Sequence, residues 1–218
     1  MYIPKSFVIT DENKLFDFIN KYNFGIISSI DMEDMSIFSS HIPFILGRKE
    51  NDEPVLLCHF SKVNKQWNII ENNPKVQIIF NGPHAYVSPK YYVTQNVPTW
   101  NYATVHVTGL AHIIRSPEER YETIKKMVLF HENSDQGWRL ESLDHEYVEK
   151  EMKGFIVVEI SNLKLLGKYK LSQNKDIENM SSVISHLLAN GGSDAECGLL
   201  MKKELEAKLP KNENEIIN

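Results

Sequence analysis

The segment from His59 to Trp67 carries the densest group of side chains that could bind an anion. Between these two residues stand two lysines, a hydroxyl and two carboxamides: Ser61, Lys62, Asn64, Lys65 and Gln66. Lysine and hydroxyl groups bind phosphate, and the unpaired backbone N–H groups at a helix start strengthen such a site. The segment leaves an expected strand and enters an expected helix, so it predicts a phosphate site. The alternative is an ordinary amphipathic helix whose lysines are solvated.

A second cationic segment, 161–175, has no acidic residue and contains four lysines: Lys164, Lys168, Lys170 and Lys175. The chain as a whole is acidic, with 24 Lys and Arg against 29 Asp and Glu and a net charge of −5. This local excess of positive charge indicates an anion site. It would also suit an exposed strand edge that lysines protect from aggregation.

The third segment is aromatic and runs Val97-Pro98-Thr99-Trp100-Asn101-Tyr102 at the end of an expected polar loop, 89–101. Trp100 and Tyr102 could form a wall for a planar ring, with the amide of Asn101 as a donor and acceptor beside it. A corner packed by two large side chains explains the segment equally well. Together, the three segments describe a site for a planar cofactor with a phosphate tail.

The chain has no sequence motif for nucleophilic catalysis, nucleotide binding or metal binding. Gly-x-Ser-x-Gly, Walker A and Gly-x-Gly-x-x-Gly patterns are absent, and the eight histidines form neither His-x-His nor His-Glu-x-x-His. We therefore expect no metal site, and no catalytic residue can be named. Cys58 and Cys197 are far apart and flanked by leucines, which predicts two reduced thiols in the core.

The elements that position these segments follow from the apolar pattern. Strands are expected over 25–30, 37–46, 55–60, 76–80, 85–88, 104–114 and 155–160, with a turn at Asn81-Gly82-Pro83. Helices are expected after an N-cap at Thr10, over 61–73, from an N-cap at Ser116, and over 144–152, 177–189 and 195–208. Gly191-Gly192 should separate the last two helices.

These strands meander, so we expect a mostly antiparallel sheet that curls into a small barrel, with peripheral helices and a C-terminal helical pair, in the α+β class. The expected division is a barrel domain over 1–175 and a helical extension over 176–218 that packs on it. No apolar run reaches the roughly 20 residues of a membrane span, and residues 1–30 lack a signal-peptide pattern. We therefore expect a cytoplasmic protein without membrane contact.

Several collinear motifs resemble one known family. They are Met1-Tyr2-Ile3-Pro4, Ser40-His41-Ile42-Pro43-Phe44, the segment 82–89, the segment 97–102, and the segment 167–174. The chain resembles the PaiB-type FMN-binding proteins, often labelled negative transcriptional regulators, over about its first 190 residues. Two positions depart from that family's pattern: Lys65 stands where proline is common, and Tyr91 where tryptophan is common.

The resemblance implies a split β-barrel related to the pyridoxamine-phosphate-oxidase group, as a homodimer with FMN at the subunit interface. It also implies the flavin-binding residues. These are His59, Ser61, Lys62, Asn64, Lys65 and Trp67 near the phosphate, Trp100, Asn101 and Tyr102 near the ring or interface, and Lys168, Lys170, Ser172, Gln173 and Asn174 facing the same site across the dimer.

Three functions remain open on the sequence. The first is an FMN-binding regulator of the PaiB type, although the acidic charge and the missing helix-turn-helix give little support to direct DNA binding. The second is an FMN-dependent oxidoreductase with an unknown small-molecule substrate, in which the flavin supplies the chemistry. The weakest is a haem-binding or haem-degrading split barrel.

Overall fold

The computed structural model describes residues 1–132 and 137–209 of the chain. Its strands are β1 (Val8–Ile9), β2 (Phe24–Ile30), β3 (Ile37–Pro43), β4 (Ile45–Arg48), β5 (Pro54–Ser61), β6 (Lys75–Val87), β7 (Thr99–Ile114) and β8 (Phe155–Lys170). Its α-helices are α1 (Glu12–Lys21), α2 (Gln66–Asn72), α3 (Pro117–Glu132), α4 (His145–Met152), α5 (Ile177–Asn190) and α6 (Gly192–Glu206). Short 3-10 turns stand at η1 (Lys5–Phe7), η2 (Pro89–Tyr91) and η3 (Leu140–Ser142). No helix in these ranges is long and apolar enough to cross a membrane.

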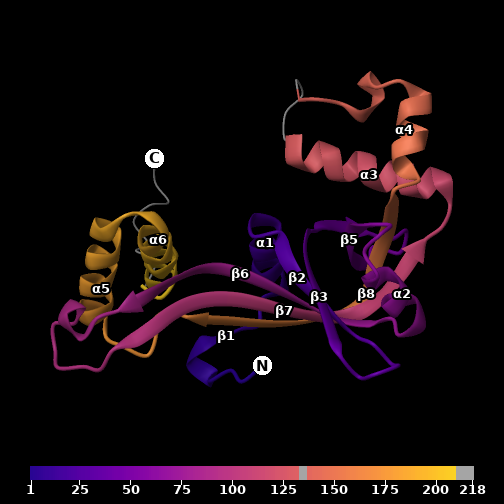
Figure 1. The fold of residues 1–218 in the computed structure, drawn as a ribbon. Coiled ribbons are helices and arrows are strands. Elements are labelled where there is room, and N and C mark those ends of the chain that lie inside the picture. The colour runs from indigo at the N-terminus through magenta and orange to yellow at the C-terminus, as the bar shows by residue number, and fades with distance from the viewer. Residues whose placement is uncertain (133–136, 210–218) are drawn as a thin grey trace. The chain divides into compact units, whose positions relative to one another are not determined.

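The strands form one sheet in the order β3-β2-β6-β7-β8-β5-β4, with β1 paired to β8 (Figure 1). The pairs β1–β8, β2–β3, β2–β6, β4–β5 and β5–β8 are antiparallel. Helices stand at several places along the chain rather than alternating with strands. The predicted α+β class with a mostly antiparallel sheet is therefore confirmed.

The described residues group into two compact units. Unit 1 takes in residues 1–10, 81–104 and 167–209, and unit 2 takes in 11–80 and 105–166, with 133–136 outside the described part. The long strands β6, β7 and β8 contribute residues to both units. The boundary expected at residue 175 stays a prediction, and residues 210–218 of the expected extension lie outside the described residues.

Unit 2 contains the larger share of the sheet, with α1, α2, α3 and α4. One core cluster joins β4, β5 and β8 to α3 and α4 through eight buried side chains: Ile45, Val55, Leu57, Ile124, Met127, Leu140, Val148 and Val157. Ser116 accepts from the Glu119 N–H at 3.3 Å, and Asp144 caps α4, so both predicted helix starts are confirmed. The first helix is different: its N-cap is Asp11, whose carboxylate accepts two backbone N–H groups, and the predicted cap at Thr10 is wrong.

In unit 1, α5 and α6 lie side by side, and the break at Gly191-Gly192 comes between them in the chain (Figure 1). Both glycines have positive φ, 75° and 53°, a conformation that glycine adopts without strain, so the predicted break is confirmed. Met180, Leu187, Cys197 and Met201 fill the core of this unit. Both cysteines are free and buried, in agreement with the prediction of reduced thiols.

Three predicted elements are wrong, and each matters for the site. The turn at 81–83 does not form, because β6 runs through Pro83, and its buried positions change from even to odd numbers there. The expected helix over 61–73 begins only at Gln66, so 61–65 form the strand end and a turn. Strand β7 begins at Thr99, which places the aromatic segment on a strand rather than in a loop.

Candidate functional site

The turn between β5 and α2 presents cationic side chains on a backbone that is already hydrogen-bonded. The N–H of Lys62 donates to the Gly154 carbonyl at 2.8 Å, and that of Asn64 donates to the Ser61 carbonyl at 2.9 Å. The Asn64 Oδ1 accepts the N–H of Gln66 at 2.9 Å. An anion at this turn would therefore be bound mainly by side chains. Ser61, Lys62 and Lys65 are exposed and meet that requirement.

The residues around the turn hold it in place. Asn64 Nδ2 donates to the Ser40 hydroxyl at 2.9 Å, and the Trp67 indole N–H donates to the Lys62 carbonyl at 2.9 Å. Gln66 is fully buried, and its Nε2 contacts the Ile27 carbonyl at 3.0 Å. It also contacts the Ser29 hydroxyl at 3.1 Å and the Phe38 carbonyl at 3.2 Å. Asn64, Gln66 and Trp67 are thus positioning residues in this structure.

His59 stands on β5, two residues before the turn, with its ring edge against Phe155 at 5.2 Å between centroids. Burial lowers the pKa of this imidazole, because the charged form loses solvation. Its Nδ1 is buried and has no hydrogen-bond partner among the residues that the structure describes. A neutral imidazole adds no charge to a phosphate site, so the cationic part of this site is Lys62 and Lys65.

In unit 1 the aromatic segment divides between the two faces of β7. Asn101 is fully buried: its Nδ2 lies 3.0 Å from the Ser172 hydroxyl and 3.3 Å from the Met201 sulfur. Trp100, half exposed, lies against His84 and Tyr86 with centroids 5.7 and 6.2 Å apart. Trp100 and Tyr102 therefore remain available to a ring, whereas the Asn101 amide is occupied within the protein.

Two lysines of β8 lie among aromatic and neutral polar groups. Lys168 is only 8% exposed, and its ammonium donates to the Tyr2 carbonyl at 3.1 Å and stands 5.2 Å from the Tyr102 ring centroid. The Lys170 ammonium donates to the Thr99 hydroxyl and, at 2.6 Å, to the Trp100 carbonyl. Burial, and then the charge of Lys168, lower the pKa of Lys170. In the described part of the chain neither lysine has a salt bridge.

The remaining three predicted residues lie in the turn after β8. Gln173 is used inside the turn: it accepts the Leu171 N–H at 2.8 Å and donates to the Tyr169 carbonyl at 2.6 Å. Ser172 is buried at a φ of 63°. Asn174 is exposed, and with Lys170, Ser172 and Asn101 it lines a cavity of about 220 Å³.

The predicted residues therefore form two groups. His59, Ser61, Lys62, Asn64, Lys65 and Trp67 belong to unit 2, and the other eight belong to unit 1. Each group is brought together within its own unit, and the prediction that both contact one flavin stays a prediction. Sequence reasoning singled out Lys175 but missed Tyr2, Asn96 and Thr99, which contact the unit 1 lysines. Tyr2 and Thr99 stood inside motifs already noted, but no spacing rule pointed to their contacts with lysine.

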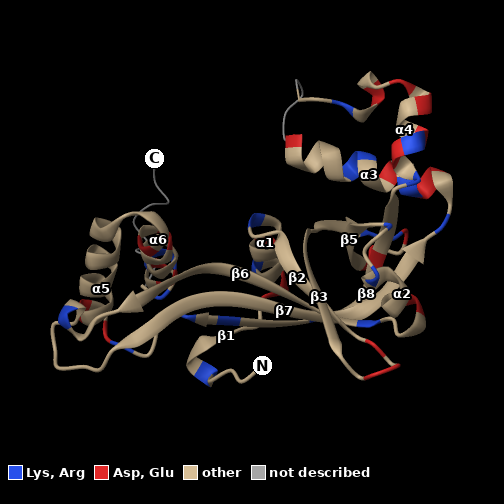
Figure 2. Cartoon of the chain, in the orientation of Figure 1, with Lys and Arg blue, Asp and Glu red and all other residues tan. Residues whose placement is uncertain are grey.

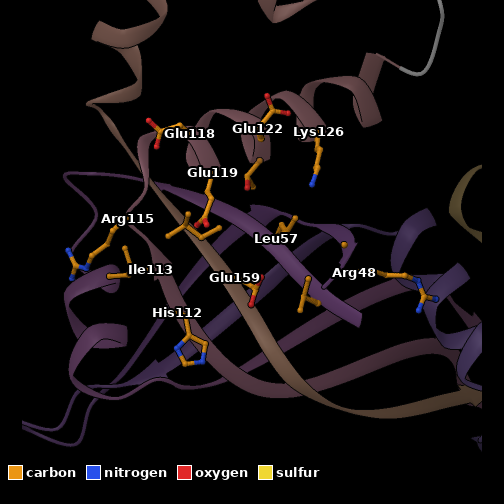
Figure 3. Close-up of a pocket in the computed structure, with 14 residues that line it drawn as sticks. Arg48, Leu57, His112, Ile113, Arg115, Glu118, Glu119, Glu122, Lys126 and Glu159 are labelled. Atoms are coloured by element: carbon orange, nitrogen blue, oxygen red, sulfur yellow. The ribbon is translucent and has the colours of Figure 1, made fainter. Parts of the chain in front are cut away.

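A larger cavity of about 550 Å³ lies in unit 2, and none of its lining residues is a predicted site residue (Figure 3). His112 and the cationic side chains of arginine and lysine line this cavity. Four glutamates also line it: Glu118, Glu119, Glu122 and Glu159. Glu118 accepts from the Ser116 hydroxyl at 2.9 Å, and Glu159 lies 3.8 Å from the Lys49 ammonium. In residues 1–132 and 137–209, no three His, Cys, Asp or Glu side chains are grouped to hold a metal ion.

The curled, mostly antiparallel sheet with peripheral helices places the chain in the class of split β-barrels. Residues 1–162 match the family described as "Putative FMN-binding domain", and the chain belongs to this family. FMN is its cofactor. The similarity to the PaiB-type proteins is confirmed by "Protease synthase and sporulation protein PAI 2" of Bacillus subtilis, which is 31% identical over 211 residues, covering 97% of this chain and 99% of that protein.

Solved structures show the same fold at low sequence identity. The flavocytochrome Anf3 of Azotobacter vinelandii matches with a TM-score of 0.58 and 12% identity over 80% of this chain and 74% of its own. A FAD and haem binding protein of Mycobacterium smegmatis matches with a TM-score of 0.54 and 12% identity over 85% of this chain and 80% of its own. The predicted split-barrel fold is confirmed.

Proposed function

We propose that this protein acts as a PaiB-type homodimer that holds FMN at the subunit interface and binds the flavin phosphate on the turn after β5. The observation that carries the proposal is the turn itself: Ser61, Lys62 and Lys65 are exposed on a backbone whose N–H groups at 62 and 64 are already paired. Two ammonium groups and a hydroxyl supply the donors that a phosphate dianion requires. The bound flavin would supply redox chemistry, which side chains of this kind do not provide.

The other predicted residues have supporting roles in this proposal. Asn64 and Trp67 fix the turn through Ser40 and the Lys62 carbonyl. Trp100 and Tyr102, on one face of β7, offer aromatic surface to the isoalloxazine ring. His59 lies beside the turn as a neutral imidazole, able to exchange a hydrogen bond without adding charge.

The test is the visible absorption spectrum of the purified protein after addition of FMN and gel filtration. We expect a retained and shifted flavin spectrum in the wild type, and about 10-fold weaker binding in Lys62→Gln and Lys65→Gln, because each loses a charge-assisted hydrogen bond. Lys75→Gln is the matched control, an exposed lysine of the same unit outside the turn. Unchanged FMN affinity in both turn variants would place the phosphate elsewhere.

The homodimer is supported by apolar side chains next to the turn. Val63 is 89% exposed and Ile37, on β3, is 73% exposed. The turn and β3 are joined by the Asn64–Ser40 hydrogen bond, and β3 stands at one end of the strand order. An exposed apolar edge beside a cofactor site is the kind of surface that a second subunit covers.

A regulatory role would be indirect in this proposal. Direct DNA binding depends on exposed lysine and arginine that neutralise phosphates. The ammonium groups of Lys168 and Lys170 instead donate hydrogen bonds to neutral carbonyl groups of their own unit. The helices α3, α4 and α6 each carry both acidic and basic side chains, so none presents a purely cationic surface (Figure 2). We expect no salt-sensitive band shift with promoter DNA, and a shift that weakens steeply with salt would favour direct binding.

A second candidate function is an FMN-dependent oxidoreductase. It is favoured by the structural neighbour from Azotobacter vinelandii, which is a flavocytochrome. Anaerobic bleaching of the bound flavin by NADH or NADPH, followed by reoxidation with candidate acceptors, would support it. Addition of haem is the matching test of haem binding, and the absence of a Soret band would remove that option.

A further inference from the structure

Unit 1 contains a cavity of about 220 Å³ whose polar lining is cationic or neutral. Lys170 and Lys175 contribute ammonium groups, and Thr99 and Ser172 contribute hydroxyls. Three carboxamides, Asn96, Asn101 and Asn174, complete the polar part of the wall. In the described part of the chain, no aspartate or glutamate lines it. A cavity with two cations and many hydrogen-bonding groups is chemically suited to an anion.

The ammonium groups at this cavity are held by neutral partners only. Lys170 donates to the Thr99 hydroxyl and the Trp100 carbonyl, and Lys175 donates to the Asn96 Oδ1 at 2.9 Å. Within residues 1–132 and 137–209, neither has a salt bridge. Asp176 is the carboxylate whose pKa responds to Lys175, and it is already hydrogen-bonded by Asn179. Within the described residues, Lys170 and Lys175 thus have no salt bridge, and Asp176 is a carboxylate whose charge interacts with Lys175.

The local backbone holds these groups in position. Ser172 has a positive φ of 63°, which is uncommon for a residue with a side chain and costs conformational energy. Its carbonyl accepts the Lys175 N–H at 2.9 Å, which closes a turn, and its hydroxyl is bonded to Asn101. The chain therefore keeps a strained turn that places Ser172, Asn174 and Lys175 at one cavity with Lys170.

We propose that this cavity binds the anionic head group, a phosphate or a carboxylate, of a small molecule other than the flavin. Its volume is below the roughly 300 to 1,000 Å³ of pockets that enclose a whole drug-sized ligand, so it fits a compact metabolite or the charged end of a larger one. The site consists of unit 1 residues only. No residue of the turn after β5 lines it, and the proposal assigns Lys170, Ser172 and Asn174 to a ligand other than the flavin.

The test is calorimetric titration of the full chain with inorganic phosphate and, separately, with acetate, in the FMN-free and the FMN-loaded protein. We expect the cavity site to be equally strong in both forms, whereas phosphate binding at the turn after β5 should be present only in the FMN-free protein. The anion that binds more tightly identifies the head group. Lys170→Met and Lys175→Met should each weaken binding by about 10-fold or more, because each removes a charge-assisted hydrogen bond.

The control is Lys90→Met, an exposed lysine of η2 in the same unit that does not line the cavity, and its affinity should equal that of the wild type. Because Lys170→Met removes contacts inside the unit, the exposed variant Asn174→Asp provides a second test: its new negative charge should also weaken binding. The proposal is overturned if neither anion binds the folded wild type, if the three cavity variants bind normally, or if FMN competes with the anion for the cavity.

Discussion

Buried polar side chains, rather than charged ones, fix the shape of the turn after β5. Gln66 illustrates this because its Nε2 lies within hydrogen-bond distance of three acceptors on β2 and β3, while its buried Oε1 has no partner within residues 1–132 and 137–209. The reverse amide orientation would direct an oxygen at two carbonyls. The present orientation therefore satisfies the greater number of groups, at the cost of one unpaired oxygen.

Replacement of Gln66 by leucine should destabilise the protein by about 1–3 kcal/mol, because the Ile27 and Phe38 carbonyls lose a donor at a buried position. Chemical denaturation measures the change in the free energy of unfolding. Gln77→Leu is the matched control, an exposed glutamine on β6, and should change that free energy by less than about 0.5 kcal/mol. Equal stability of the two variants would show that Gln66 has no such role.

His59 gives the protein a predictable response to acid. Burial lowers the pKa of its imidazole, so below the unfolded-state value of about 6.5 the unfolded chain binds a proton that the folded chain does not. The contribution of the neutral, buried His59 to the free energy of unfolding should be fully present above about pH 6.5. It should be lost as the pH decreases from there towards the folded-state pKa. In His59→Leu this loss should be smaller but not absent, because burial also lowers the pKa of His106. A variant with the wild-type pH profile of unfolding would contradict the assignment to His59.

At the scale of elements, the sequence predicted best where a local motif decides the structure. The caps at Ser116 and Asp144 and the break at Gly191-Gly192 each depend on a few adjacent residues. The wrong predictions concern segments whose conformation depends on pairing within the sheet. Asn81-Gly82-Pro83 has the composition of a turn, yet β6 continues through it, and Thr99–Asn101 pair as strand although a proline precedes them.

The same reasoning explains what was predictable of the site. The collinear motifs identified the family and the candidate flavin-binding segments, and the chain does belong to the FMN-binding family. They could not show that Asn101 faces the helices of unit 1 or that Gln173 serves its own turn, because side-chain direction depends on strand register. They also could not identify Thr99 or Asn96, which reach Lys170 and Lys175 only through the folded loop.

Strand β7 contains a close approach that the fold requires. A Cβ at Gly109 would lie 2.7 Å from the Ser161 carbonyl oxygen and 2.7 Å from the Ile160 side chain, both on β8. Gly109→Ala should therefore cost about 1–3 kcal/mol of stability through overpacking, measured as a lower denaturation midpoint. Gly154→Ala is the milder comparison, since its Cβ would meet a single carbonyl at 3.2 Å. A Gly109→Ala protein as stable as Gly154→Ala would rule out this close packing.

At the scale of the whole molecule, the structure describes two compact units, each with its own group of cationic side chains. The flavin proposal uses the turn of unit 2, and the anion proposal uses the cavity of unit 1. The proposed homodimer relates to the first of these, because the exposed apolar residue Val63 lies in the turn and Ile37 lies on β3, the strand that hydrogen-bonds to the turn. FMN retention and dimer formation should consequently depend on the same surface.

This dependence can be tested with charge substitutions. Val63→Glu and Ile37→Glu alter side chains that are largely exposed in the single chain, so the fold should persist, whereas a glutamate buried in a subunit interface would be strongly unfavourable. Light scattering during gel filtration should give about twice the mass of one 25.2 kDa chain for the wild type, and a dimer weakened by about 10-fold or more in either variant, with FMN retention lost in parallel. Leu199→Glu, an exposed leucine on α6, should change neither property. A wild-type monomer that retains FMN would separate cofactor binding from dimerisation, and dimers unaffected by both substitutions would place the interface on another surface.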